Sequence, residues 1–271
     1  DHLDQHTNFS EYATAKKNIL RFQKEADFAI LNYDQKIVRK TREKTPAQVL
    51  FFSQKRDLSK GAFLEDDKVT VSFRGKKFSI INISELKILG KHNIGNVLAA
   101  VLVGILYGIK SEKISQTLLR FSGLSHRIEF IEEISGVKFY NDSKATTSES
   151  TIAAVKCFKK PVILICGGKE KNTDPSRLAE IIVQRAKYVF LIGETAKKLE
   201  SLIFKKSKTT EKSILKKVTV SKYLKRAFVD AAKIAKKGDT ILLSPAASSF
   251  DQFENFEQRG DKFKKLVKGT K

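Results

Sequence analysis

The sequence predicts an α/β fold in two domains, the second of which is a doubly wound parallel sheet. Three observations lead to this prediction. The chain has 271 residues and is 41% hydrophobic, which is enough for about two domains. From about residue 124, short apolar runs alternate with helical patterns, which favours a parallel sheet covered by helices on both faces. The preceding residues follow a different order, so we place a boundary near Gly123, between domains 1–123 and 124–271.

The first domain is expected to mix helices, strands and one hairpin. Residues 10–23 (SEYATAKKNILRFQ) favour a helix, whereas 28–34 (FAILNYD) and 49–53 (VLFFS) favour strands. The alternation in KVTVSFRGKKFSI around RGKK predicts a hairpin over residues 68–80. A long apolar helix is expected over residues 90–109, and a further helix over 111–123 with Ser111 as its N-cap.

In the second domain each expected strand is followed by an expected helix. The strands are 137–142, 161–168, 188–193, 218–221 and 239–246, and the helices are 151–158, 176–186, 194–203, 224–235 and 250–267. Ligands of such sheets bind at the carboxyl ends of the strands. Three polar loops follow strands here, namely NDSKATT, GGKEKNTD and SPAASSFDQF, and these predict the site.

The composition limits the classes of function that this chain could have. The net charge of +22 permits nucleic-acid binding, but no aromatic-flanked basic motif accompanies it, so a solvated lysine-rich surface is the favoured interpretation. Cys157 and Cys166 match no metal or disulfide spacing and are expected to be reduced thiols. No signal peptide and no apolar run of roughly 18 residues occurs, which favours a cytoplasmic protein.

Taken singly, the polar motifs have ordinary explanations as well as functional ones. Asp142 could cap a helix, and Arg127 in SHRIE could be a surface ion-pair partner or a phosphate clamp at the domain boundary. The start DHLDQH combines two carboxylates and two imidazoles, which suit a metal ion or proton transfer but are also common on surfaces. No single motif decides between these alternatives.

Together the motifs resemble one family. The segments DHLDQH…YATAK, GKHNIGNVLAA, GLSHRIE, YNDSKATT, GGKEKN and SPAASSFDQFENFEQRGDKF are similar, in this order, to motifs of the Mur ligases of peptidoglycan synthesis. The last segment is similar to the D-glutamate-adding members, and the DNPR motif of the diamino-acid-adding members is absent. The resemblance implies the C-terminal part of a P-loop-type ATPase central domain, followed by a Rossmann-like C-terminal glutamate ligase domain. The family's P-loop pattern does not occur in this sequence, so we expect a fragment that is inactive by itself.

The resemblance also implies an activity. ATP would phosphorylate the carboxylate of UDP-N-acetylmuramoyl-L-alanine, and the amine of D-glutamate would attack the resulting acyl phosphate, with Mg²⁺ as cofactor. Neither a membrane nor a nucleic acid is expected as a partner. Two alternatives stay open: another ligase of the Mur or folylpolyglutamate synthase type, and a basic nucleic-acid-binding α/β protein.

The family's functional residues map onto eleven positions here. By resemblance, His2 would bind Mg²⁺, Lys16 would be a carbamylated lysine that organises the metal, and Arg127 would reach the ATP phosphates. The nucleotide would be contacted by Asn93, Asn96, Asp142 and Lys144, and D-glutamate by Thr146, Lys171, Ser249 and Phe256. The sequence departs from the family pattern in the loop GGKEKNTD. Lys169 and Glu170 follow the two glycines there, where the family often has a small or acidic residue.

Overall fold

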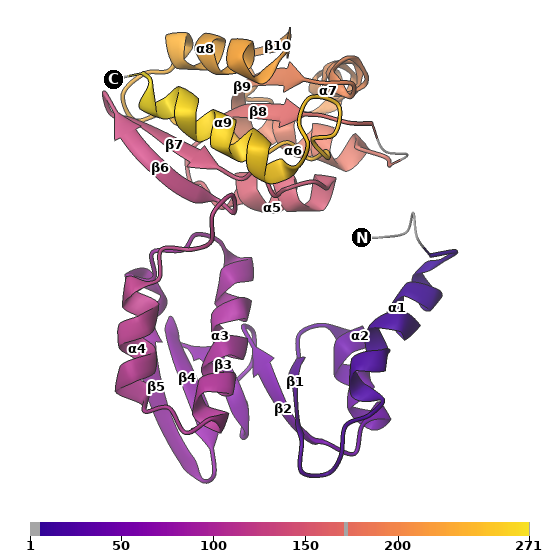
Figure 1. The fold of residues 1–271 in the computed structure, drawn as a ribbon, viewed down its shortest axis with the longest axis vertical. Coiled ribbons are helices and arrows are strands. Elements are labelled where there is room, and N and C mark those ends of the chain that lie inside the picture. The colour runs from indigo at the N-terminus through magenta and orange to yellow at the C-terminus, as the bar shows by residue number, and fades with distance from the viewer. Residues whose placement is uncertain (1–5, 171–172, 271) are drawn as a thin grey trace. The chain divides into compact units, whose positions relative to one another are not determined.

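The structure of the chain is a computed structural model that describes residues 6–170 and 173–270 (Figure 1). The chain divides into two compact units, Asp1–Phe121 and Ser122–Lys271. Each unit combines one sheet with helices, so the predicted α/β class is confirmed.

Unit 1 contains a five-stranded mixed sheet in the order β1-β2-β3-β4-β5. The strands are β1 (Phe28–Asn32), β2 (Gln48–Ser53), β3 (Gly61–Glu65), β4 (Lys68–Phe73) and β5 (Lys76–Asn82). β1, β2 and β3 are parallel, and β3, β4 and β5 form an antiparallel meander that contains the predicted hairpin. The helices are α1 (Phe9–Lys17), α2 (Lys36–Arg39), α3 (Lys91–Leu106) and α4 (Ser111–Arg120), with 3₁₀ segments Asn18–Leu20, Lys40–Lys44 and Ile83–Glu85.

The long apolar helix α3 is a core helix of unit 1. Val97, Leu98, Val101 and Leu102 are buried in one cluster with strand residues such as Leu50. Within α3, Gly104 lets α4 approach closely, since a Cβ there would lie 2.9 Å from Ile114 Cδ1. None of the described helices is long and apolar enough to cross a membrane.

Unit 1 differs from the sequence prediction at several elements: α2 was not predicted, and α1 ends at Lys17 although the predicted helix extends to residue 23. Ser111 is the first residue of α4 and not its N-cap; Lys110 occupies the cap position without a side-chain hydrogen bond. The Ser111 hydroxyl donates instead to Glu112 at 3.0 Å. Strand β3 was missed because its five residues include a glycine and lack clear alternation.

Unit 2 contains a six-stranded sheet in the order β10-β9-β8-β11-β7-β6. The strands are β6 (Glu129–Ile134), β7 (Val137–Asn141), β8 (Val162–Gly167), β9 (Ala186–Ile192), β10 (Lys217–Lys222) and β11 (Thr240–Leu243). All neighbours are parallel except β6, which is antiparallel to β7. The predicted parallel sheet is therefore confirmed, with one antiparallel edge strand that the sequence analysis missed.

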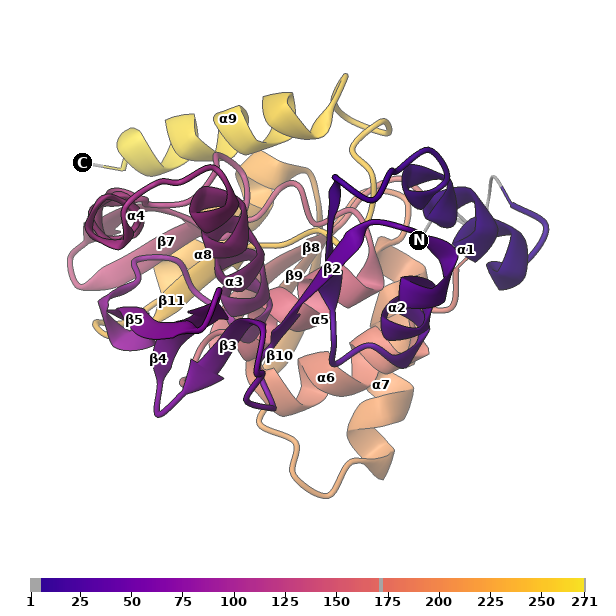
Figure 2. The same ribbon diagram turned by 90° about the horizontal axis from the view of Figure 1, so that it is seen from below.

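Helices cover both faces of this sheet (Figures 1 and 2). The helices are α5 (Ser148–Lys156), α6 (Ser176–Arg185), α7 (Ala196–Thr209), α8 (Leu224–Ile234) and α9 (Phe256–Lys268). One core joins Phe228 of α8 and Phe263 of α9 to alternate strand residues such as Ile163 and Ile165. The intervening residue Leu164 faces the opposite side, where α5, α6 and α7 pack beside one another. The strands β7, β8, β9 and β11 are parallel neighbours. Their carboxyl ends therefore meet at one edge of the sheet.

Candidate functional site

Four loops of unit 2 gather at this edge, and buried Arg259 connects two of them directly. Arg259 Nε donates to Ser143 Oγ at 3.0 Å, and Nη2 donates to the carbonyl oxygens of Ser143 and Ala247 at 2.9 and 3.0 Å. Nη1 donates to the Ser248 carbonyl at 3.2 Å. Burial lowers the pKa of Arg259 to about 10, so the guanidinium remains charged at neutral pH. Arg259, which is 1% exposed, thus fixes the loop after β7 to the loop after β11.

The loop after β8 joins the same network through its backbone. Lys169 N–H donates to the Ser248 carbonyl at 2.9 Å, so one carbonyl serves both Lys169 and Arg259. Gly168 N–H donates to Thr195 Oγ1, and Thr195 N–H donates back to the Gly168 carbonyl, both at 3.1 Å. Gly168, at φ +157°, must be glycine because a Cβ would collide with the Ser248 carbonyl oxygen. The loop after β9, which contains Thr195, is a part of the site that the sequence analysis missed.

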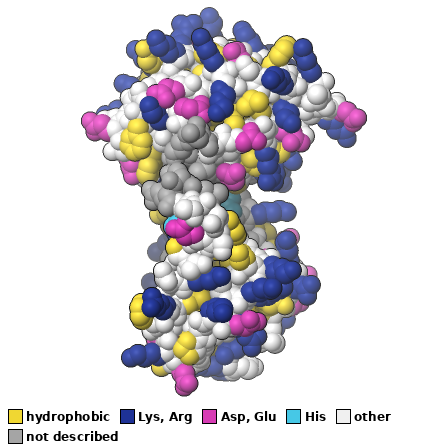
Figure 3. All heavy atoms as spheres, turned by 90° about the vertical axis from the view of Figure 1, so that its right-hand side faces the viewer, with side chains coloured by type: hydrophobic (Ala, Val, Ile, Leu, Met, Phe, Trp, Pro, Cys, Tyr) yellow, Lys and Arg dark blue, Asp and Glu magenta, His cyan; other side chains and the backbone are white. Residues whose placement is uncertain are grey.

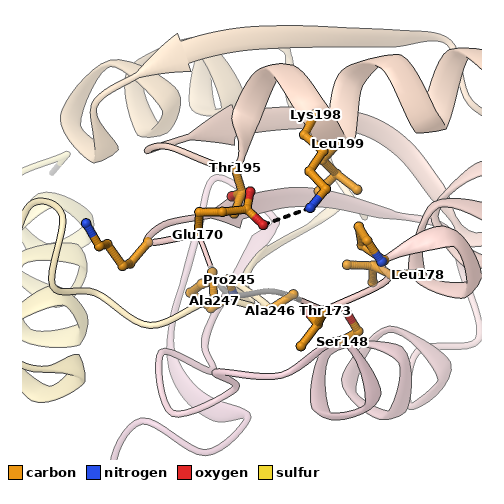
Figure 4. Close-up of a pocket in the computed structure, with 12 residues that line it drawn as sticks. Ser148, Glu170, Thr173, Leu178, Thr195, Lys198, Leu199, Pro245, Ala246 and Ala247 are labelled. Carbon is orange, nitrogen blue, oxygen red and sulfur yellow. Dashed lines mark hydrogen bonds and ion pairs between the residues drawn. The ribbon is translucent and has the colours of Figure 1, made fainter. Parts of the chain in front are cut away.

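Two ion pairs cross from the β8 loop to the start of α7. The Lys169 ammonium lies 2.8 Å from Glu194. The Lys198 ammonium lies 2.9 Å from Glu170, as the dashed line in Figure 4 marks. The Lys169 and Glu170 side chains therefore both have partners within unit 2. They help line a small cavity of about 30 Å³, together with residues of α5, α6, α7 and the β11 loop. Its polar lining includes Ser148, Thr173 and Thr195 (Figure 4).

Both carboxylate oxygens of Asp142 accept hydrogen bonds from other residues of unit 2. Its Oδ1 accepts a hydrogen bond from Ile128 N–H at 3.1 Å, and its Oδ2 accepts one from the Ser244 hydroxyl at 2.7 Å. The Ser244 hydroxyl also lies 2.9 Å from Thr151 Oγ1 of α5. Because Asp142 is buried, it connects the ends of β7 and β11 rather than standing free at the surface.

We expect Asp142 to make stability depend on pH. Burial raises its pKa to about 7, although the hydrogen bonds from Ser244 and Ile128 and the charge of Arg127 oppose the rise. Since the folded pKa is above the unfolded value of about 4, the contribution is full below about pH 4 and is lost as pH rises through about 7. The free energy of unfolding of the wild type relative to Asp142→Asn should fall across this window, by at most about 4 kcal/mol.

Urea unfolding at a series of pH values measures this difference. Asp230→Asn is the matched control, because Asp230 is a surface partner of Arg226 on α8. Its difference from the wild type should vary little between pH 4 and 7. A flat difference for Asp142→Asn would contradict the assignment.

The structure brings Lys144 and Phe256 together. Lys144 is exposed, and its ammonium lies 5.5 Å from the centroid of the Phe256 ring. Phe256 begins α9 and also meets the His126 ring edge-on, with centroids 6.1 Å apart. Ser249 is buried in the β11 loop and Thr146 is half-buried in the β7 loop, so both belong to the same edge of the sheet.

Of the other predicted residues, Arg127 is exposed just before β6, and the rest belong to unit 1 or lie outside the described residues. Asn93 and Asn96 lie in the first turns of α3 in unit 1, where the Asn96 amide donates to Asn93 Oδ1 at 3.1 Å. Lys16 is exposed on α1, and its ammonium lies 5.5 Å from the Tyr12 ring centroid. His2 and Lys171 lie outside the described residues. Within residues 6–170 and 173–270, no group of three or more His, Cys, Asp or Glu side chains could hold a metal ion.

Two family models match the chain. They are the Mur ligase middle domain over residues 1–104 and the Mur ligase, glutamate ligase domain over residues 126–247. The chain belongs to the Mur ligase family.

Within this family, the chain is similar to curated relatives that share one name. The chain is 41% identical over 267 residues to a UDP-N-acetylmuramoylalanine–D-glutamate ligase of Thermoanaerobacter sp. (strain X514), covering 98% of this chain and 58% of the relative. It is 38% identical to the ligase of the same name from Alkaliphilus metalliredigens (98% and 57% covered) and 39% to that of Koribacter versatilis (99% and 57%). The chain thus spans 57–58% of the length of these relatives.

Solved structures support the fold at much lower identity. MurF from Acinetobacter baumannii matches with a TM-score of 0.71 at 16% identity, covering 99% of this chain and 58% of that one. A pseudomurein peptide ligase type C from Methanothermus fervidus gives 0.69 at 18% identity (100% and 61%). MurF from Thermotoga maritima, solved with ADP, gives 0.66 at 16% identity (100% and 60%).

Proposed function

We propose that the protein to which this chain belongs joins D-glutamate to UDP-N-acetylmuramoyl-L-alanine at the expense of ATP, as a cytoplasmic enzyme of peptidoglycan synthesis. The observation that carries this proposal is the 38–41% identity, over 98% of the chain, to relatives that are named for this reaction. In this proposal residues 1–123 belong to the central ATPase domain, and residues 124–271 form the glutamate ligase domain.

The proposed chemistry suits the residues at the strand-end loops. Phosphoryl transfer depends on positioning and on neutralising charge, and a guanidinium is suited to this because its donors match phosphate oxygens. We assign this role to Arg127, which is exposed, together with Lys144. Asn93 and Asn96 are proposed to contact the adenine. Asp142 is proposed to act on the nucleotide side by shaping the loop, because both its oxygens bind the protein.

D-Glutamate is proposed to bind at the loops after β7, β8 and β11. A glutamate carboxylate needs a cationic partner, which we assign to Lys171. Thr146 and Ser249 supply hydroxyls, and Phe256 supplies an apolar wall. The network around Arg259 supports this proposal because it ties these loops together.

His2 and carbamylated Lys16 are the residues that we propose to bind Mg²⁺. The described residues do not by themselves form a metal site, so no step of the reaction is assigned to the ion. The residues of this chain would bind and orient ATP and D-glutamate.

The alternative of nucleic-acid binding finds little support. Lys and Arg side chains are spread over the visible face with acidic and apolar side chains between them, rather than gathered in one stripe (Figure 3). Binding of an oligonucleotide at physiological salt, weakening steeply as salt is raised, would favour this alternative.

The substrate assignment can be tested with Lys171→Ala in the full-length protein. We expect the KM for D-glutamate to rise about tenfold to a hundredfold, since a charge-assisted hydrogen bond contributes about 1.5–3 kcal/mol. The KM for ATP should change little. Steady-state phosphate release measures the first constant when D-glutamate is varied and the second when ATP is varied.

Lys169→Ala is the matched control, two residues earlier in the same loop. Its ammonium already pairs with Glu194 at an exposed position, so a change of only a few-fold is expected. An unchanged KM for D-glutamate in Lys171→Ala would remove Lys171 from the proposed site. Absence of D-glutamate ligation by the wild-type full-length protein would overturn the proposed function itself.

A further inference from the structure

The turn His126–Arg127–Ile128 holds two non-glycine residues in the left-handed region. His126 has φ +64° and Ile128 has φ +46°. This conformation is unfavourable for a residue with a side chain, and for a β-branched residue such as Ile128 it is a rare outlier. Backbone strain of this kind persists only where surrounding contacts hold it, and it concentrates at functional sites.

Hydrogen bonds hold the turn on both sides of Arg127. The His126 N–H donates to Glu129 Oε2 at 2.9 Å, and its carbonyl accepts from Lys144 N–H at 3.0 Å. The Ile128 N–H donates to Asp142 Oδ1 at 3.1 Å. The His126 and Ile128 side chains are both buried.

Glu129 links this turn to the rest of unit 2. Besides His126 N–H, its Oε2 accepts a hydrogen bond from Asn141 Nδ2 of β7 at 3.1 Å. Its Oε1 lies 3.4 Å from the Lys264 ammonium of α9. The Asn141 Nδ2 atom also lies 2.9 Å from His126 Nδ1, so the ring nitrogen accepts a hydrogen bond from the amide. Both the backbone and the side chain of His126 are therefore held by hydrogen bonds.

The result is an exposed arginine between two anchored neighbours. His126 and Ile128 are buried, whereas Arg127 is exposed. A backbone fixed on both sides limits the positions that the guanidinium can reach. Such a preorganised group loses less entropy when it binds an anion.

We infer that Glu129 and Asn141 are positioning residues for Arg127, and that the strained turn exists to present its guanidinium to a phosphoryl group. This inference rests on the proposed function, in which that group belongs to ATP or to the acyl phosphate. Glu129 and Asn141 do not touch the substrate; they act through Arg127.

A double-mutant cycle in the full-length protein tests the inference. Glu129→Ala should lower kcat/KM for ATP about tenfold, and Arg127→Ala should lower it about a hundredfold or more. In the Arg127→Ala background, Glu129→Ala should have almost no further effect, because there is no longer a guanidinium to position. Glu129→Gln keeps an acceptor oxygen for His126 N–H and should retain most activity. The KM for D-glutamate should stay within about twofold of the wild type in Glu129→Ala.

Two further variants keep the test decisive. Glu133→Ala removes another acid from β6, whose 4.0 Å pair with Lys138 has no connection to the turn, and should leave kcat/KM unchanged. If Glu129→Ala fails to fold, Glu129→Asp shortens the side chain by one methylene and should show the same lack of additivity with Arg127→Ala. ATP affinity measured by calorimetry gives a readout that does not need turnover.

The outcomes separate the two proposals. Additive losses in the cycle, in kcat/KM and in ATP affinity alike, would overturn the positioning role even if the wild type ligates D-glutamate. If the wild type does not ligate D-glutamate, the proposed function fails, and non-additivity in ATP affinity alone would still support the positioning role.

Discussion

Replacing Arg259 by alanine should destabilise unit 2 by at least about 3 kcal/mol, since one or two of its charge-assisted hydrogen bonds would account for that amount. The side chain is almost completely buried and donates to three carbonyl oxygens and one hydroxyl. Alanine would leave those carbonyls without their donor and would also leave a cavity. The melting temperature should fall by roughly 6–12 °C, at 2–4 °C per kcal/mol for a chain of this size.

Thermal and urea unfolding of residues 1–271, followed by circular dichroism, measure this loss. Arg226→Ala is the matched control, because the Arg226 side chain on α8 is 70% exposed and pairs with Asp230 one turn away. Its effect should stay within about 0.5 kcal/mol. Arg259→Lys should recover only part of the lost stability. The guanidinium is a planar fork that donates to both loops at once, whereas an ammonium is a single point of charge. Equal stability of Arg259→Ala and Arg226→Ala would show that the loops are held by other contacts.

Lys16→Ala in the full-length protein should lower kcat by roughly a hundredfold, at the upper end of what groups that organise a metal site cost. The reason is the proposed carbamate, which converts the lysine into an anion. In the structure Lys16 is exposed, and its ammonium lies near the face of Tyr12, where it is attracted to the ring. An anionic carbamate would lose that attraction, whereas a bound cation would stabilise it.

A short carboxylic acid added to Lys16→Ala should restore part of the activity by replacing the missing carboxylate. The neighbouring Lys17→Ala, also in the last turn of α1, should retain nearly full activity and should not respond to the acid. Carbon-13 NMR of the protein equilibrated with labelled bicarbonate at neutral pH would detect the carbamate without acidification. Full activity of Lys16→Ala would exclude the role.

The regular elements could be predicted because their patterns are local. In unit 2 every predicted strand and helix is present, since apolar residues recur with period 2 or 3.6 along the chain itself. At the start of α9 the prediction failed because local turn and cap hydrogen bonds prevailed over the helical pattern. The helix expected from residue 250 begins only at Phe256, because Asn255 caps it and the Ser249 carbonyl accepts from Gln252 and Phe253 in a separate turn.

The strand β6 shows the same limit. Its sequence EFIEEI carries three acids, and only its pairing with β7 makes it a strand. Edge strands expose one side to water, so charged residues are tolerated there and weaken the sequence pattern. The ion pairs of Lys169 with Glu194 and of Glu170 with Lys198 were equally hidden, because the partners lie 25 and 28 residues further along the chain.

By itself the sequence determined the α/β class and the family, together with the loops that carry the candidate residues. These follow from local periodicity and from motifs that occupy contiguous segments. Only the tertiary structure decided that Arg259 holds those loops together, that Asp142 serves the protein, and that Arg127 stands on a strained turn. Arg259 and Ser143 are 116 residues apart, and Asp142 and Ser244 are 102 apart. A buried polar group must find its partners in space, and no local pattern of residues reports where the chain will bring them.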